Sequence, residues 1–409
     1  MKKQAKNKQH LQTNQRLTHA KKNLRLVIAE SGITAGLLAM PIMTPFFNSI
    51  GLNQAQISET QMLFTVVTML LNLPLGYIAD RFSRKWANII GDFGHAIIML
   101  AYSQVGGFWG AVACECFFGL SSALTDGVDQ SLLKHFVGKV AEETGESERK
   151  LLRSKTAKLE IVRQASNLIL MLLGGPIGAI SLRLAIALSA VNHFIGGIIS
   201  IFIDDDSEKF QPVHKNPIKD IAHITKTTAK SPMLRRRIIA FAIAREMTHG
   251  IIWVVTPLFL KAGVPMSVVS FAWVGNSLMA ILGARLAYKY GKNLSDTTTV
   301  AIPLAMMTFS MIIMALRLNI ITVWLYGLMG ITQGWTAATM IPMVQHYAKA
   351  SEQTSVISLA KMLAQLLYIP VVWVIGLVAD VELTYSLIAT VVIFLPLGII
   401  SIKSLAKTA

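Results

Sequence analysis

Charge is scarce in this chain of 409 residues. Only 15% of the residues are charged, against about 25% in an average soluble domain, and 53% are hydrophobic. A helix needs roughly 20 largely apolar residues to cross the hydrocarbon core of a bilayer. The sequence has twelve such segments, which excludes a soluble globular protein and predicts an integral membrane protein. The segments are 24–47, 57–79, 86–105, 108–133, 156–178, 183–203, 236–260, 266–288, 296–316, 319–345, 354–378 and 383–402.

Cysteine is almost absent. The only two, Cys114 and Cys116, lie two residues apart in one predicted helix, and residues at that spacing point to different faces. We therefore predict no disulfide and no metal site. The sequence also lacks a glycine-rich nucleotide-binding loop, an HExxH motif and a convergent nucleophile and base, so we expect no cofactor and no enzymatic activity. The first 22 residues lack the apolar core of a signal peptide.

Acidic residues are few, with 22 Asp and Glu against 38 Lys and Arg and a formal net charge of +16. The basic residues gather in the two terminal segments and in alternate loops, and the opposite loops hold only Arg183, Lys261 and Arg317. Lys and Arg in short loops stay on the cytoplasmic side of a membrane. We therefore expect both termini in the cytoplasm, a location in the cell membrane, that is, the cytoplasmic membrane of a bacterium, and no nucleic-acid partner.

The sequence repeats itself weakly. TPFFNSIG (44–51) returns as TPLFLKAG (256–263), and LLKHF (132–136) returns as MVQHY (343–347). Such a repeat, with six segments in each copy, predicts two parallel halves with a binding site between them near the middle of the membrane. The predicted parts are a basic tail (1–22), a first six-helix bundle (23–204), a cytoplasmic linker (205–234) and a second six-helix bundle (235–409).

The turn between the second and third segments carries a recognisable motif. The stretch GYIADRFSRK, from Gly76 to Lys85, resembles the signature turn of the major facilitator superfamily, although Ser83 stands where that family usually has glycine. The resemblance implies an all-α membrane protein of twelve transmembrane helices in two six-helix halves. It further implies a transporter of small molecules that works by alternating access. We expect a monomer in the lipid bilayer.

The resemblance also implies a charge cluster that closes the cytoplasmic side. Asp126 and Asp129 continue a stripe of the fourth segment that includes Glu115 at helical spacing, and we expect them level with Arg81 and Arg84. The alternative is that these basic residues only fix the topology. The predicted cytoplasmic gate consists of Gly76, Asp80, Arg81, Arg84, Lys85, Asp126 and Asp129.

Ionisable residues at membrane depth face the protein interior or a water-filled cavity. On this ground Glu30, Glu115 and Glu246 are the candidates for proton coupling, and Glu246 would be a structural lock if it paired with Arg245. We expect Glu160 and Arg163 to pair locally. The predicted lining of the cavity is Thr34, Asn72, Arg163, Asn167, Arg245, His249, Trp253, Asn276, Gln333, Thr336, Lys361 and Gln365.

Two further polar pairs occur in segments that would be peripheral in this family. Asp92 with His95, and Asn192 with His193, are expected near an interface or in hydrogen bonds between helices, outside the transport pathway.

The direction of transport rests on one short stretch. LLGGPIGA (172–179) resembles, incompletely, the Gly-Pro motif of proton antiporters within the superfamily. It favours export of amphipathic small molecules with protons as the coupling ion. Two alternatives stay open, a proton-coupled uptake symporter for a polar nutrient such as a sugar or an amino acid, and a non-transporting receptor with a transporter fold.

Overall fold

The structure is a computed structural model that describes residues 2–204, 225–226, 228, 230–291, 294–348 and 353–407. Within these ranges it does not describe the side chains of residues 2–12, 73, 77, 80–82, 149, 153 and 353–355. Most of the predicted linker therefore lies outside the described residues. All regular secondary structure in the described ranges is helical.

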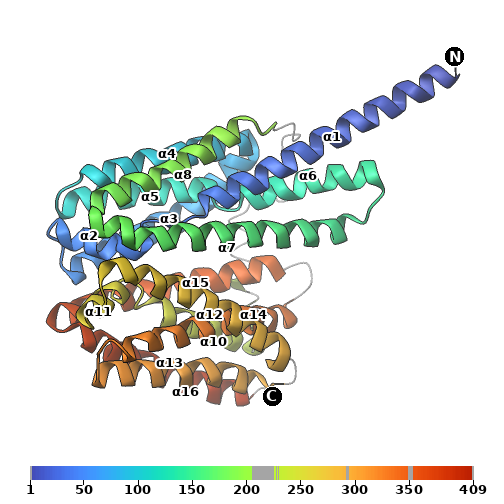
Figure 1. The fold of residues 1–409 in the computed structure, drawn as a ribbon. Helices are drawn as coiled ribbons and strands as arrows, with labels where there is room; N and C mark the ends of the chain where they lie inside the picture. The colour runs from blue at the N-terminus through green and yellow to red at the C-terminus, as the bar shows by residue number, and fades with distance from the viewer. Residues whose placement is uncertain are drawn as a thin grey trace.

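The helices form two layers, one from each half of the chain (Figure 1). The first half contains α1 (Lys2–Thr34), η1 (Met40–Ile42), α2 (Met43–Ser49), α3 (Gln54–Phe82), α4 (Arg84–Gln104), α5 (Phe108–Thr125), α6 (Val128–Thr144), α7 (Glu148–Ile180) and α8 (Leu182–Ile201). The second half contains α10 (Pro232–His249), α11 (Val255–Lys261), α12 (Met266–Tyr290), α13 (Asp296–Leu316), η3 (Thr322–Leu325), α14 (Tyr326–His346), α15 (Gln353–Val381) and α16 (Leu383–Ala406).

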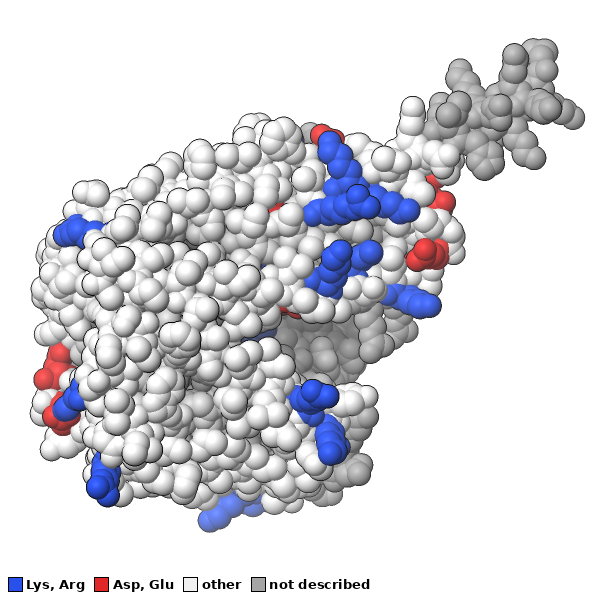
Figure 2. All heavy atoms as spheres, in the orientation of Figure 1, with Lys and Arg blue, Asp and Glu red and all other residues white. Residues whose placement is uncertain are grey.

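The long helices of both halves run in nearly the same direction, and the two chain ends lie at the same end of the molecule (Figure 1). We call this the termini end, and the opposite end, where the short helices α2 and α11 lie, the α2–α11 end. Lys and Arg side chains gather toward the termini end, whereas the long flank in view is almost free of charge (Figure 2).

Each of the twelve predicted segments corresponds to one long helix or to two or three helices in succession. Six spans among the described helices are long and apolar enough to cross a membrane. Four segments are broken where the sequence suggested one continuous helix. The segment 24–47 divides into α1, η1 and α2, 108–133 into α5 and α6, 236–260 into α10 and α11, and 319–345 into η3 and α14.

One of these breaks has a local cause. Gly127 has φ 76° between α5 and α6, a left-handed conformation that glycine adopts without strain. The predicted stripe from Glu115 to Asp129 is therefore not continuous, because Asp129 belongs to a different helix.

The two copies of the sequence repeat meet each other at the α2–α11 end. TPFF lies in α2 and TPLF in α11. The Thr44 hydroxyl donates to the Trp253 carbonyl of the second half at 2.9 Å. The Thr256 hydroxyl donates to the Pro41 carbonyl of the first half, also at 2.9 Å. These reciprocal hydrogen bonds join the halves at this end.

Glycines bring the two halves close at the same interface. The backbone N–H of Gly175 in α7 donates to the Ser270 hydroxyl of α12 at 2.5 Å. A Cβ at Gly376 in α15 would lie 2.3 Å from the Ser58 hydroxyl oxygen of α3. Such small residues allow the close backbone approach that packing between membrane helices requires.

Glycines also set the spacing inside the second half, where α12 packs against α14. A Cβ at Gly334 would lie 1.8 Å from the backbone oxygen of Ala280, and one at Gly330 would lie 2.2 Å from that of Asn276. Both contacts are with backbone atoms, so a side chain at either position forces the helices apart.

We predict that Gly334→Ala lowers the melting temperature of the purified protein, because overpacking a close contact costs about 1–3 kcal/mol. Gly275→Ala is the matched control, since a Cβ at Gly275 of α12 meets nothing within 4 Å. Alanine in a helix is about 0.5–1 kcal/mol more stable than glycine, so this control should leave the melting temperature unchanged or raise it. Equal melting temperatures for the two variants would contradict the packing described.

Candidate functional site

A cavity of about 800 Å³ lies between the halves and is lined mainly by the first half, with Lys361 and Gln365 of α15 added from the second. Figure 2 shows the surface hollowed between the two halves toward the termini end. The volume is in the range of about 300–1,000 Å³ that is usual for small-molecule sites.

The wall of this cavity is polar and acidic. Among the described residues that line it, five acids outnumber two bases, Arg163 and Lys361. Phe64 and Ala35 are the few apolar side chains in it. The acidic lining residues are Glu30, Asp92, Asp126, Asp129 and Glu160.

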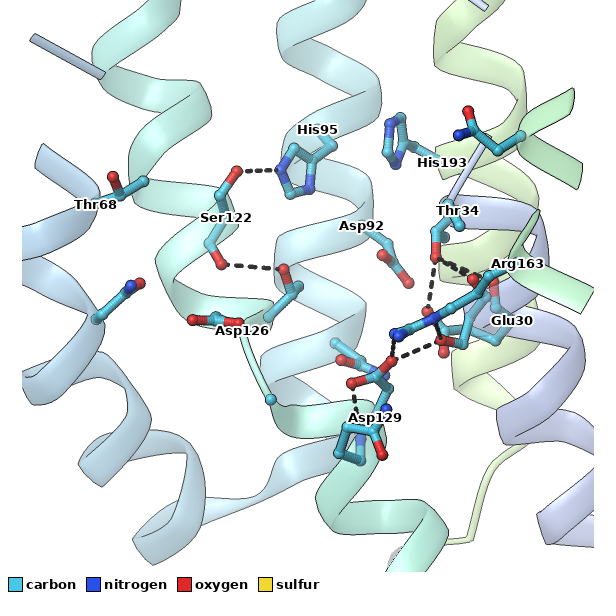
Figure 3. Close-up of a pocket in the computed structure, with 18 of the residues that line it drawn as sticks. Glu30, Thr34, Thr68, Asp92, His95, Ser122, Asp126, Asp129, Arg163 and His193 are labelled. Atoms are coloured by element: carbon cyan, nitrogen blue, oxygen red, sulfur yellow. Dashed lines mark hydrogen bonds and ion pairs between the residues drawn. The ribbon is translucent and has the colours of Figure 1, made fainter. Parts of the chain in front are cut away.

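Arg163 of α7 bonds to three side chains on one side of the cavity (Figure 3). Its guanidinium pairs with Asp129 and donates from Nη1 to Glu160 at 3.1 Å. Its Nε donates to the Ser31 hydroxyl at 2.9 Å, and that hydroxyl donates to Asp129 at 2.6 Å. The predicted local pair of Glu160 and Arg163 is confirmed. Two carboxylates thus share one cation, which leaves excess negative charge beside it.

The predicted gate is only partly described. The side chains of Asp80 and Arg81 lie outside the described set, and Asp129, which we expected level with Arg81 and Arg84, pairs with Arg163. The break at Gly127 places Asp129 in α6, a helix separate from that of Glu115. Arg84 is 8% exposed and Lys85 half-buried, while Asp126 is exposed.

The absence of glycine at Ser83 carries no strain. Ser83 has φ −175° and ψ 125°, which is extended backbone, and its hydroxyl accepts the N–H of Trp86 at 3.2 Å as the cap of α4. Serine is a favourable N-cap. Among the described residues, no atom outside its own chain neighbours lies within 4 Å of the Cβ position of Gly76.

Glu30 lies in the cavity wall next to a second carboxyl group. It is 3% exposed, and its Oε1 accepts the Thr34 hydroxyl at 3.4 Å. The carboxyl groups of Glu30 and Asp92 interact directly. Asp92, His95 and His193 all line the cavity (Figure 3), a position that we did not expect for them. The expected hydrogen bonds between helices are present: the Ser200 hydroxyl donates to Asp92 at 3.3 Å, His95 bonds to Ser122 at 3.0 Å, and Asn192 donates to the Gly36 carbonyl at 3.0 Å.

The acids Glu115 and Glu246 are buried outside this cavity, from opposite halves. Glu115 is 5% exposed and Glu246 2%. Glu115 accepts the Gln61 amide at 2.6 Å and a hydrogen bond from Tyr102. Glu246 pairs with Arg245 at 3.4 Å, which is the arrangement we associated with a structural lock.

A tyrosine of the second half lies within range of the charges of both acids. Glu246 and Glu115 both act on Tyr368 of α15. Its hydroxyl accepts the indole N–H of Trp253 at 3.0 Å. Trp253 therefore belongs to the closed α2–α11 end and not to the cavity wall, where we predicted it.

A smaller cavity of about 170 Å³ lies in the second half. Arg245, His249 and Lys361 line it, so its charged groups are basic, in contrast with the first half. Gln333 and Thr336 line it as predicted. Asn276 does not, because its amide donates to Gln333 at 3.3 Å between α12 and α14. The predicted residues that line the larger cavity are Thr34, Asn72, Arg163, Asn167, Lys361 and Gln365.

A carboxylate closes the α2–α11 end, and the sequence analysis missed it. Asp380 of α15 accepts the backbone N–H groups of Gln54 at 2.6 Å and Ala55 at 3.0 Å. It therefore caps the first turn of α3 in the opposite half, where a negative charge is favourable. Two residues on, Glu382 pairs with Lys261 inside its own half, and that hydrogen bond holds the pKa of the Glu382 carboxyl below its usual range.

Two helical halves around a polar cavity, with several strongly apolar helices, define a multi-pass membrane transporter. The chain belongs to the Major Facilitator Superfamily, whose family model matches residues 29–372. Family and fold are those of transporters, which are not enzymes. No curated protein matches the chain.

Solved transporters share this fold at low sequence identity. A mutant of the nucleoside transporter NupG has a TM-score of 0.74 at 13% identity, over 95% of this chain and 99% of that one. A bacterial homolog of the human lysosomal transporter Spinster, in an inward-facing and unoccupied conformation, has 0.72 at 12%, over 96% and 98%. The POT family transporter PepTSo has 0.69 at 10%, over 95% and 98%.

We predict that Asp380→Ala increases the population in which the α2–α11 end is open. Loss of a helix cap costs about 1 kcal/mol, which changes the ratio of two states by roughly fivefold. Pulsed electron spin resonance between labels at Gly106 and Arg317 measures the opening, in a chain with Cys114 and Cys116 replaced by serine. Glu382→Ala is the control and should leave the distance distribution unchanged. The same shift in both variants would show that Asp380 has no special role.

Proposed function

We propose that this protein is a proton-coupled antiporter that exports small polar cations by alternating access. Twelve crossings with cytoplasmic termini are part of the proposal. The gathering of Lys and Arg toward the termini end supports that orientation. The termini end is then the cytoplasmic end, and the conformation described, joined at the α2–α11 end, is open to the cytoplasm.

The charge of the cavity wall carries the proposal. Five acids face two bases in a cavity with low-dielectric walls, and such a cavity concentrates ions of the opposite sign. A positively charged substrate would offset the excess charge that Arg163 leaves on Asp129 and Glu160. Because the lining is mostly polar, a small polar cation fits it better than the amphipathic molecule that the sequence favoured.

Glu115 is the acid we assign to proton coupling. The other two candidates are set aside. Glu246 is paired with the cation Arg245, and Glu30 lies in the wall of the substrate cavity. Glu115 takes hydrogen bonds only from the neutral groups of Gln61 and Tyr102 among the contacts described for it. It also lies near Tyr368 of the opposite half, so separation of the halves would change its contact with water.

Export is favoured by the position of the Gly-Pro stretch. Gly175 of this stretch donates its N–H to Ser270 across the interface, whereas Gly174 packs inside its own half, where a Cβ would lie 2.2 Å from the Leu38 carbonyl oxygen. The stretch that resembles the antiporter motif thus includes a contact between the halves, and such contacts change as access alternates.

The basic lining of the second half supports a second candidate. A zwitterion could place its ammonium group against the first half and its carboxylate near Arg245, His249 and Lys361. This is the proton-coupled uptake of an amino acid or a similar polar nutrient. A receptor with a transporter fold would bind such a ligand without moving protons.

We predict that quaternary ammonium compounds added outside proteoliposomes raise the pH of the lumen, because each cation that enters is exchanged for protons. Such compounds cannot cross as neutral bases, and protein-free liposomes give the background. Glu115→Gln should lower the proton flux at least tenfold and still bind the cation. Glu142→Gln, at an exposed acid of α6, should behave as the unmodified protein.

Two outcomes would contradict this assignment. Acidification of the lumen would mean symport. An undiminished proton flux in Glu115→Gln would mean that another acid couples transport.

A further inference from the structure

We propose that Asp92, His95 and His193, with Glu30 beside them, form a binding site for a divalent transition-metal ion of the Zn²⁺ type. This inference goes beyond the proposed export of organic cations and does not depend on it. It also differs from our expectation from the sequence, which was that the protein has no metal site.

The fold brings these residues together from distant parts of the chain. Asp92 and His95 are three residues apart on α4 and therefore share a face, and His193 is on α8. The two helices pack closely because α8 has glycine where α4 approaches. A Cβ at Gly197 would lie 3.0 Å from the ring of Phe93.

The geometry is close to that of a coordinated ion. One potential ligand atom from each of Asp92, His95 and His193 lies within 4.8 Å of the others. The two imidazole rings are nearly parallel, with centroids 4.9 Å apart. Bonds of about 2.0–2.2 Å to nitrogen and oxygen place two ligands of one zinc ion roughly 3–4 Å apart, so small side-chain rotations complete the site.

Two buried atoms, one in this cluster and one beside it, have no hydrogen-bond partner among the described residues. These are Nδ1 of His193 and Oε2 of Glu30, and the Glu30 side chain is 97% buried as judged by its 3% exposure. Nearly all buried polar atoms in proteins have a partner. A cation between the imidazoles and the carboxylates would satisfy both atoms.

His95 makes a hydrogen bond to a neighbouring helix. Its Nε2 lies 3.0 Å from the Ser122 hydroxyl of α5. In the tautomer that carries its proton on Nδ1, rotation of that hydroxyl frees the Nε2 lone pair for a metal.

The types of ligand atom in this cluster indicate which class of metal ion it would bind. Imidazole nitrogens together with carboxylate oxygens suit Zn²⁺, Co²⁺ and related ions, whereas Mg²⁺ and Ca²⁺ prefer oxygen ligands alone. A dication would also offset the charges of Glu30 and Asp92, whose carboxyl groups interact directly. All four side chains line the large cavity, which gives the ion a way in.

The test uses the full chain, purified in detergent without a histidine tag, and Co²⁺ and Zn²⁺ as probes. We expect one Co²⁺ per chain, with a visible absorption band and displacement by Zn²⁺. His193→Gln should weaken Co²⁺ binding by more than the roughly 10–100-fold that loss of an outer-shell partner costs. Asp92→Asn should also weaken it, and His346→Gln, on α14, should not.

Gel filtration and melting temperature establish that each variant is folded. The proposal is overturned if the folded protein binds no Co²⁺, if His193→Gln binds it equally well, or if Ca²⁺ binds as tightly as Co²⁺. Such a failure leaves the exchange of quaternary ammonium ions for protons unaffected. Loss of that exchange with intact Co²⁺ binding would instead refute only the proposed function.

Discussion

The hydrogen bonds that Thr44 and Thr256 donate across the interface hold one end of the molecule together. Each comes from a short helix that exists because the first segment of its half is broken, and each ends on a backbone carbonyl of the other half. Asp380 adds a charged cap to α3 at the same end. Because the halves meet here, the polar cavity lies toward the other end, where both termini lie.

The contacts at this closed end suit a part of the protein that switches between two states, joined and separated. Its contacts combine hydrogen bonds between the halves with apolar packing, such as that of Trp253 and Met266 against the core of the first half, and glycines allow the backbones to approach. Contacts of this kind can be broken as a group and remade at the opposite end. Tyr368, Trp253 and Glu115 lie at this interface, so a change in the contact between the halves reaches the acid that we assign to proton coupling.

The two halves supply charged residues of different sign. The first half supplies the acids of the large cavity, and the second half supplies Arg245 and Lys361. Charged groups at membrane depth are costly unless they face a cavity or a partner. The excess of acids in the first half therefore leaves negative charge in the cavity wall. A positively charged substrate would balance this charge.

Much of this could be predicted from the sequence because it is local or repeated. The helix segments follow from apolar runs, the pairing of Glu160 with Arg163 follows from helical spacing, and the TPFF and TPLF copies mark equivalent helices. The partner of Asp129 was missed because the left-handed Gly127 breaks the predicted helix and places Asp129 in α6. The cluster of Asp92, His95 and His193 was missed because His193 is 98 residues after His95, and only the packing of α4 on α8 brings them together.

The most direct test of the account is whether the cavity selects positive charge. Binding of quaternary ammonium compounds can be compared with binding of their neutral analogues, in which carbon replaces the nitrogen, through the rise in melting temperature that a bound ligand causes. The account predicts that the cation stabilises the protein and that the neutral analogue of the same shape does not. Equal stabilisation by both, or stabilisation only by amino acids, would contradict it.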